Sequence, residues 1–130
     1  MILDTSFILD LMEEDKGAVA RYVKLSENNE IVRVCAPTIF ELWTGIACSS
    51  SPEAEKAKVS NALSQFDVIK FDGRCAEKAG EINGSLIRGG RRIDPEDTMI
   101  AGTALLENET VLTRNVKHFS RVLGLRVETY

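Results

Sequence analysis

The sequence predicts an α/β fold, in which a mainly parallel sheet carries helices on both of its faces. Short segments rich in Val, Ile and Leu alternate with longer segments whose apolar residues recur at helical spacing, as in βα units. The 130 residues include 44% hydrophobic and 28% charged side chains and only three prolines. This composition excludes a disordered tail, a collagen-like repeat and a small disulfide scaffold. We expect a single domain over 1–130.

Three strands are expected in the first half of the chain. Residues 1–3 form a very short strand, and apolar residues at positions 7, 8, 11 and 12 predict a helix after it. A second helix is predicted over about 16–28, followed by a β-branched strand over 30–36. Pro37 begins a third helix, and Pro52 begins a fourth that runs to about residue 66. Residues 67–71 form the third strand.

The second half of the chain adds two strands. A turn at Asp72 leads into a helix over about 74–88, and 89–92 is a flexible basic loop. Asp94 and Pro95 begin the most apolar helix, over 95–107, which precedes a strand over 110–113. A short helical turn near 116–122 and a strand over 125–129 follow. No stretch approaches the roughly 18 apolar residues of a membrane helix, and the start of the chain lacks the pattern of a secretory signal.

The cysteines and the net charge bear on the redox compartment of the protein and on how it could bind nucleic acid. Cys35, Cys48 and Cys75 form no CxxC motif, and an odd number of cysteines cannot pair completely. We expect them to be buried free thiols in a reducing cytoplasm. The net charge of −4 argues against a protein that binds nucleic acid mainly by bulk electrostatic attraction.

Three acidic residues are predicted to meet at one edge of the sheet. Asp4 follows the first strand, Glu41 lies near the start of the third helix, and Asp97 lies at the start of the helix over 95–107. Ligands of parallel sheets bind at the carboxyl ends of the strands, where neighbouring ends lie about 5 Å apart. Carboxylates gathered there repel one another, and a divalent cation such as Mg²⁺ or Mn²⁺ relieves that repulsion.

Each of these acids also has a simpler interpretation as a helix cap. Asp4 is suited to cap the helix that follows it, and Asp94 to cap the helix that begins at Pro95. Thr38-x-x-Glu41 matches a capping box. The only histidine, His118, lies in a basic segment that favours a surface role. A phosphate-binding loop, a serine-hydrolase elbow and a His-rich zinc site find no support in the motifs of the chain.

Four short motifs occur in order along the whole chain. They are Asp4-Thr5-Ser6, Glu41-Leu42-Trp43-Thr44-Gly45, Asp97-Thr98-Met99-Ile100-Ala101-Gly102-Thr103-Ala104 and Thr113-Arg114-Asn115-Val116-Lys117-His118-Phe119. Together they resemble a PIN-domain ribonuclease, and specifically a VapC toxin of a prokaryotic type II toxin–antitoxin pair. The resemblance implies a three-layer α/β/α sandwich around a five-stranded parallel sheet. It also implies Mg²⁺- or Mn²⁺-dependent endonuclease activity on RNA, a homodimer, and inhibition by a small antitoxin.

The same resemblance assigns roles to individual residues. Asp4, Glu41 and Asp97 match the acidic metal-site positions of the family, and Ser6 and Thr113 match hydroxyl positions that support those carboxylates or the substrate. We expect the three acids to hold one or two metal ions that activate a water for attack on the phosphate.

The chain departs from the family pattern at two positions. Asn115 stands where the family often has an acid, and His118 stands where a second aspartate is common. An amide offers a carbonyl oxygen but no charge, so the number of metal ions stays open, although Asp94 is placed to compensate. We expect Asn115 to orient a water or the phosphate. Basic residues that flank the site are expected to bind the RNA backbone unless they are solvated surface charges: Arg91, Arg92, Arg114 and Lys117.

Two other functional classes fit the sequence. One is a non-catalytic PIN-like module that binds RNA or a protein, and the other is a metal-dependent phosphatase or DNA nuclease on a similar sheet. Independently, the segment over 38–66 carries much apolar surface, including Phe40 and Trp43, and aromatic residues are enriched at interfaces. We expect an antitoxin bound there to present an arginine to the acidic cluster.

Overall fold

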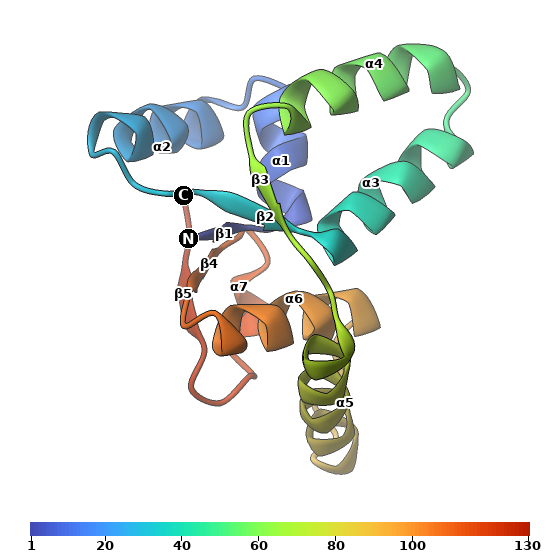
Figure 1. The fold of residues 1–130 in the computed structure, drawn as a ribbon, viewed down its shortest axis with the longest axis vertical. Coiled ribbons are helices and arrows are strands. Elements are labelled where there is room, and N and C mark those ends of the chain that lie inside the picture. The colour runs from blue at the N-terminus through green and yellow to red at the C-terminus, as the bar shows by residue number, and fades with distance from the viewer.

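The computed structural model describes residues 1–130 as a five-stranded sheet with helices on both faces (Figure 1). All neighbouring strands are parallel, in the order β3-β2-β1-β4-β5, which confirms the predicted α/β/α sandwich. The strands are β1 (Ile2–Leu3), β2 (Arg33–Cys35), β3 (Asp67–Ile69), β4 (Thr110–Leu112) and β5 (Arg126–Glu128). The helices are α1 (Thr5–Met12), α2 (Lys16–Glu27), α3 (Ala36–Cys48), α4 (Pro52–Leu63), α5 (Gly73–Arg88), α6 (Pro95–Leu106) and α7 (Val116–Phe119).

Successive residues of the central strands point into two separate hydrophobic cores. Leu3 and Leu112 pack with residues of α1, α2, α3 and α4 on one face of the sheet. Ile2 and Val111 pack with residues of α5, α6 and α7 on the other face. In Figure 1 the first group of helices lies above the sheet and the second group below it. Because the central strands are buried on both faces, their sequences are continuously apolar rather than alternating.

The strands and some helices are shorter than their sequences predict. The strand expected over 30–36 is confined to Arg33–Cys35, and Ile31 is 74% exposed. Its carbonyl accepts a hydrogen bond from the amino group of Met1 instead of pairing in the sheet (2.8 Å). The strands expected over 67–71 and 125–129 shorten in the same way, because each pairs only over the three residues that face its neighbour.

The three cysteines are unpaired, but they are not all buried. Cys35 and Cys75 are buried, and burial raises the pKa of the Cys35 thiol to about 11. The expectation of burial is wrong for Cys48, which is exposed in the last turn of α3, where the helix runs out into solvent before α4. None of the helices, of which α5 is the longest with 16 residues, has the combination of length and apolar character needed to cross a membrane.

The order of the strands creates a switch point at the centre of the sheet. From β1 the chain proceeds to β2 and β3 on one side, and then crosses to β4 and β5 on the other side of β1. The carboxyl ends of β1 and β4 are therefore neighbours, and Asp4 N donates to Leu112 O there (3.0 Å). In sheets of this kind the crevice at the switch point is the usual ligand site.

Helices α5 and α6 pack against each other with very little space between their backbones. A Cβ atom added to Gly102 on α6 would lie 2.9 Å from the backbone nitrogen of Ala79 on α5. Both residues are buried. Since that distance is too short for two non-bonded heavy atoms of these types, only glycine permits the observed approach.

This contact predicts that Gly102→Ala destabilises the protein. The added methyl group must push α5 away from α6, and overpacking of this kind costs about 1–3 kcal/mol. Gly80→Ala on α5 is the matched control, because a Cβ there meets nothing within 4 Å. Gly80→Ala is expected to raise the free energy of unfolding by about 0.5–1 kcal/mol, since alanine is the better helix former. Urea denaturation followed by circular dichroism compares the two, and equal effects would contradict this account of the helix contact.

Candidate metal centre at the carboxyl edge of the sheet

Asp4 lies at the switch point and is held by two hydroxyl groups. It directly follows β1 and is buried. Its Oδ2 accepts hydrogen bonds from Ser6 Oγ and Thr113 Oγ1, both at 2.7 Å, and a longer one from the backbone N–H of Ser6 (3.4 Å). Asp4 is therefore both the cap of α1 and a member of the edge cluster, because its carboxylate bridges α1 and the end of β4.

Glu41 does not form the capping box that the sequence suggests. Helix α3 begins at Ala36, and its cap residue Cys35 makes no side-chain capping bond. Glu41 therefore lies in the second turn of α3, beyond reach of the helix start. Its Oε2 accepts a hydrogen bond from Thr5 Oγ1 on α1 (2.5 Å). This bond ties the carboxylate to α1, next to Asp4, rather than to its own backbone.

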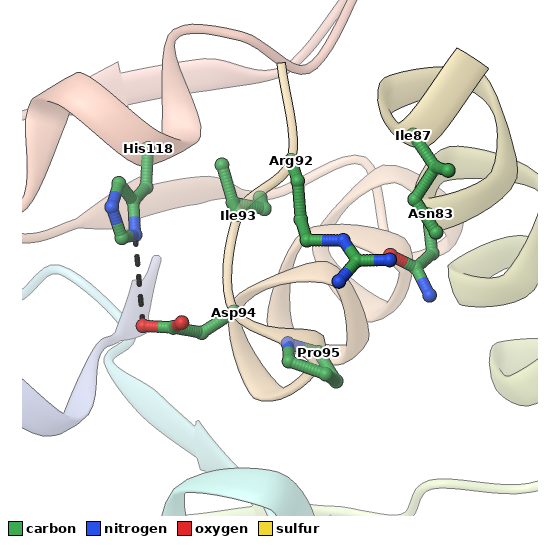
Figure 2. A pocket seen from close by; sticks show the side chains of 7 residues that line it. All are labelled: Asn83, Ile87, Arg92, Ile93, Asp94, Pro95 and His118. Carbon is green, nitrogen blue, oxygen red and sulfur yellow. Dashed lines mark ion pairs between the residues drawn. The ribbon is translucent and has the colours of Figure 1, made fainter. Parts of the chain in front are cut away.

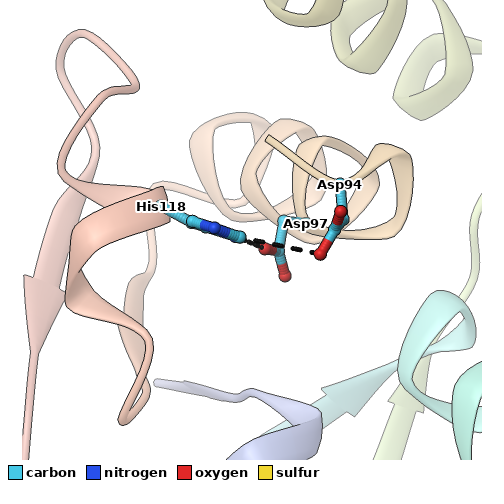
Figure 3. Close-up of side chains that lie close together, drawn as sticks. All are labelled: Asp94, Asp97 and His118. Atoms are coloured by element: carbon cyan, nitrogen blue, oxygen red, sulfur yellow. Dashed lines mark hydrogen bonds and ion pairs between the residues drawn. The ribbon is translucent and has the colours of Figure 1, made fainter. Parts of the chain in front are cut away.

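Asp97 lies in the first turn of α6 and is 7% exposed. Its Oδ2 accepts hydrogen bonds from His118 Nδ1 (2.6 Å) and Asn115 Nδ2 (3.2 Å). Figure 3 shows the ring of His118 directed at Asp97, with Asp94 beside it. Asn115 is the cap residue of the short helix α7, and His118 lies within that helix three residues later. Both side chains therefore point to the same side of α7.

The expected surface role of His118 is wrong. Phe119 is fully buried against α6 and the sheet, and this contact fixes the orientation of α7. The preceding residue, His118, is then turned toward the cluster and is only partly exposed. Two signals in the sequence pointed to this arrangement: the Asn115-x-x-His118 spacing, and the position of His118 where the resembled family commonly has an aspartate.

Asp94 is also more than a helix cap. It occupies the cap position of α6, but its side chain makes no capping hydrogen bond. Its Oδ2 lies 4.0 Å from His118 Nδ1, and one ligand atom each of Asp94, Asp97 and His118 fall within 4.8 Å of one another. The spacing of these three groups is suited to a metal ion.

The carboxylates of the cluster repel one another. Burial raises the pKa of Glu41 to about 7, with further contributions from the negative charges of Asp4, Asp97 and Glu96, while the Thr5 hydrogen bond opposes the shift. Burial likewise raises the pKa of Asp97 to about 6, helped by the charges of Asp4 and Asp94 and opposed by His118. Three acids from β1, α3 and α6 therefore share one region of negative potential.

The free oxygens of the three acids suit a hard divalent cation. In each of Asp4, Glu41 and Asp97, one carboxylate oxygen accepts the hydrogen bonds described above, and the second has no hydrogen-bond partner in the chain. Carboxylate oxygens of this kind match the preferences of Mg²⁺ and Mn²⁺, and a cation would favour the ionised forms of Glu41 and Asp97, whose pKa values burial raises. The chemistry of these residues fits a divalent metal ion. Of the three acids, only Asp97 belongs to a group whose ligand atoms lie within 4.8 Å of one another, together with Asp94 and His118. Asp4 and Glu41 lie outside that group.

The basic residues expected to flank the site are dispersed. Arg92 lines a pocket with Asp94 and His118 (Figure 2). Arg114 forms an ion pair with Asp10 of α1 (2.8 Å), and Lys117 is exposed on α7. Arg91 instead lines a separate pocket formed by α5 and the segment after α7.

Comparison with known proteins identifies the family. The PIN domain profile matches residues 1–124. The tRNA(fMet)-specific endonuclease VapC of Shigella flexneri is 31% identical over 129 residues, which cover 99% of this chain and 96% of the relative. Ribonuclease VapC2 of Rickettsia felis is 27% identical over the same shares of the two chains.

Solved structures agree in fold over the full length. The crystal structure of VapBC2 from Rickettsia felis, bound to a DNA fragment from its promoter, superposes with a TM-score of 0.88 at 26% identity, over 99% of this chain and 97% of that one. DNA-bound VapBC from Salmonella typhimurium gives a TM-score of 0.86 at 30% identity, over 98% and 96%. The resemblance read from the four motifs is confirmed: the chain belongs to the PIN-domain family, among the VapC ribonucleases.

Proposed function

We propose that residues 1–130 form one PIN-like domain that hydrolyses RNA at the cluster of Asp4, Glu41 and Asp97, with Mg²⁺ or Mn²⁺ as the cofactor. The observation that carries this proposal is the placement of the three acids at the carboxyl edge of the sheet, where the charges of Asp4 and Asp97 act on Glu41 and each acid keeps one oxygen without a hydrogen-bond partner. A divalent cation bound there supplies the Lewis acidity that activates water and stabilises charge on the phosphate.

The surrounding residues of the chain orient these acids. Ser6 and Thr113 donate to the same oxygen of Asp4, so the other oxygen keeps no hydrogen-bond partner in the chain. Asn115 and His118 do the same for Asp97. Because hydroxyl and amide donors favour the ionised form of a carboxylate, they offset part of the repulsion within the cluster. Asn115 and His118 are also positioned to orient the phosphate or the attacking water.

We propose exposed, single-stranded or looped RNA as the substrate, because a crevice at the edge of a sheet cannot reach phosphates packed inside a folded duplex. The Shigella flexneri relative is named for tRNA(fMet), which makes initiator tRNA the first substrate to test. The exposed side chains of Arg92 and Lys117 lie on the side of the cluster formed by α6 and α7 and are suited to bind its backbone. We place this activity in the cytoplasm, which the three unpaired thiols support.

We further propose that an antitoxin segment docks in the apolar pocket between α1, α3 and α4. This pocket has a volume of about 260 Å³, and its walls include Leu9, Leu42 and Ile46. It reaches Thr5 and Glu41, so an arginine from the docked segment would meet the carboxylates. The VapBC complexes among the similar structures support a partner of this class.

We also propose a homodimer, as the resemblance to VapC toxins implies; Phe40 and Trp43, exposed on α3, are assigned to the antitoxin surface. Light scattering of the purified protein measures the molar mass, and a monomer at micromolar concentration would contradict this part of the proposal.

Asp4→Asn is expected to abolish metal-dependent RNA cleavage while the fold stays intact. The amide keeps the shape of the side chain but removes one of the charges that attract the cation. Metal-ion catalysis contributes several kcal/mol, so the rate should fall at least about 100-fold. The measurement is cleavage of initiator tRNA and of a mixed RNA pool with Mn²⁺, Mg²⁺ or EDTA.

Asp67→Asn is the matched control, because Asp67 is exposed on the edge strand β3 and makes no side-chain contact with the cluster. It should cleave like the wild type. Cleavage by Asp4→Asn at the wild-type rate would contradict the assignment of the metal centre. If the wild type and both variants bind RNA but none of them cleaves it, the result would favour the non-catalytic module.

The raised pKa values predict how the stability of the metal-free protein depends on pH. Glu41 and Asp97 have folded-state pKa values of about 7 and about 6, above their ordinary values of 4.5 and 3.8. The folded state therefore favours their protonated forms, and this stabilisation is complete below about pH 4 and lost as the pH rises through 6 and 7. In EDTA, the Tm of the wild type should fall between about pH 5 and pH 8 more steeply than the Tm of Glu41→Gln.

Divalent cation should reverse that loss. Mn²⁺ at about 100 times its Kd stabilises a protein by about 2.7 kcal/mol, and the Mn²⁺-induced rise in Tm should grow with pH because the ligands must be ionised. Thermal denaturation with Mn²⁺ or EDTA measures both effects. Glu53→Gln, exposed in the first turn of α4, controls for the loss of a surface carboxylate. A wild-type Tm that Mn²⁺ leaves unchanged would count against the site.

A further inference from the structure

A second pocket opens directly beside the acidic cluster, on the opposite face of the sheet from the apolar pocket. It lies between the end of α5 and the start of α6 and has a volume of about 480 Å³ (Figure 2). This volume is in the range of pockets that bind small molecules and cofactors. Its wall includes Asp94 and His118, and His118 also contacts Asp97. An occupant of this pocket therefore adjoins the metal centre.

Two polar side chains in this pocket have no partner within the chain. The carboxamide of Asn83 on α5 and the guanidinium of Arg92, in the loop before α6, lie next to each other in Figure 2 and line the end of the pocket away from His118. Neither side chain makes a hydrogen bond or an ion pair with another residue, so the donors of Arg92 and the donor and acceptor of Asn83 remain available to a ligand.

The remaining surface of the pocket is apolar. Ile87 on α5 is 44% exposed at its rim, and Ile93 is buried beneath it. A large exposed aliphatic side chain beside free polar groups is the kind of surface on which an unstacked base packs, while hydrogen bonds read its edge. A guanidinium at the same place binds a phosphate or stacks on the base.

The charges of the pocket are arranged along its length. Asp94 lies at the end near His118 (4.0 Å), and Arg92 extends toward Asn83 at the other end (Figure 2). The negative end is the one that faces the metal centre. An RNA strand that passes from the acidic cluster into the pocket therefore meets the positive charge of Arg92 after it has passed the carboxylates.

We propose that this pocket binds the nucleotide of the RNA substrate that adjoins the scissile phosphate. Arg92 binds the backbone phosphate of that nucleotide, Asn83 hydrogen-bonds to the edge of its base, and Ile87 packs against the face of the base. The proposal rests on the proposed ribonuclease function and extends it, because the pocket selects which base stands next to the cleaved bond.

The contribution of Arg92 is tested by RNA binding in the absence of cleavage. A fluorescently labelled single-stranded RNA of random sequence is titrated in EDTA at several salt concentrations, and anisotropy gives the Kd. Loss of one phosphate contact should weaken binding several-fold and reduce the slope of log K against log salt by about 0.7. We expect this for Arg92→Ala, whereas Arg92→Lys should keep the slope because it keeps the charge. Arg88→Ala is the matched control, since Arg88 is exposed on α5 and lines no part of this pocket.

The contribution of Asn83 is tested by cleavage specificity. A randomised RNA is cut with Mn²⁺, and sequencing of the products gives the base frequency at each position around the cleaved bond. Asn83→Ala should reduce the preference at one position next to that bond by about tenfold, because a side chain that reads a base edge discriminates by a factor of this order. Ser85→Ala, on the same helix but outside the pocket, should leave the preference unchanged.

The outcomes separate this proposal from the function on which it rests. Wild-type protein that neither cuts nor binds RNA would overturn both. The second outcome is wild-type cleavage that depends on metal and Asp4, together with an unchanged salt slope in Arg92→Ala and an unchanged base preference in Asn83→Ala. This outcome would overturn the nucleotide pocket alone. The pocket proposal would also be wrong if the two substitutions weakened binding of the antitoxin but left both RNA measurements at wild-type values. Since neither side chain makes a hydrogen bond or an ion pair within the chain, both variants should keep the wild-type Tm.

Discussion

Repulsion among Asp4, Glu41 and Asp97 is the constraint on which the rest of the site depends. The three carboxylates come from β1, α3 and α6, and their burial raises the pKa of Glu41 and of Asp97 well above the ordinary range. Each is restrained by a donor from a different element: Thr113 after β4, Thr5 on α1, and His118 on α7. The bonds that hold the acids in place therefore also tie the edge of the sheet to the helices around it.

Local sequence was sufficient to predict the fold because its signals agree with one another. The central strands are buried on both faces, so they read as short apolar runs, and Pro52 and Pro95 mark helix starts. A parallel sheet also has one carboxyl edge, which is why acids after a strand and at two helix starts could be expected to converge. The predicted positions of Asp4, Glu41 and Asp97 followed from this topology rather than from contacts between particular side chains.

The misread residues are those whose local pattern has two meanings. Thr38-x-x-Glu41 is a capping box only if the helix begins at Thr38; because it begins at Ala36, Glu41 turns instead to Thr5, 36 residues earlier in the chain. His118 lies among charged residues, as surface histidines do, yet burial of the neighbouring Phe119 turns its ring toward Asp97. In both cases the deciding contact joins distant segments, and no periodicity within a single segment carries that information.

The two faces of the sheet offer the cluster two different approaches. The pocket formed by α1, α3 and α4 is apolar and ends at Thr5 and Glu41, whereas the pocket formed by α5, α6 and α7 carries Arg92 and Asn83 and ends at Asp94 and His118. The sheet separates them everywhere except at its carboxyl edge. If the antitoxin docks in the apolar pocket as proposed, it would leave the proposed nucleotide pocket open. A cationic side chain that it presents to the carboxylates would then compete with the cation, and RNA would still bind the inhibited protein.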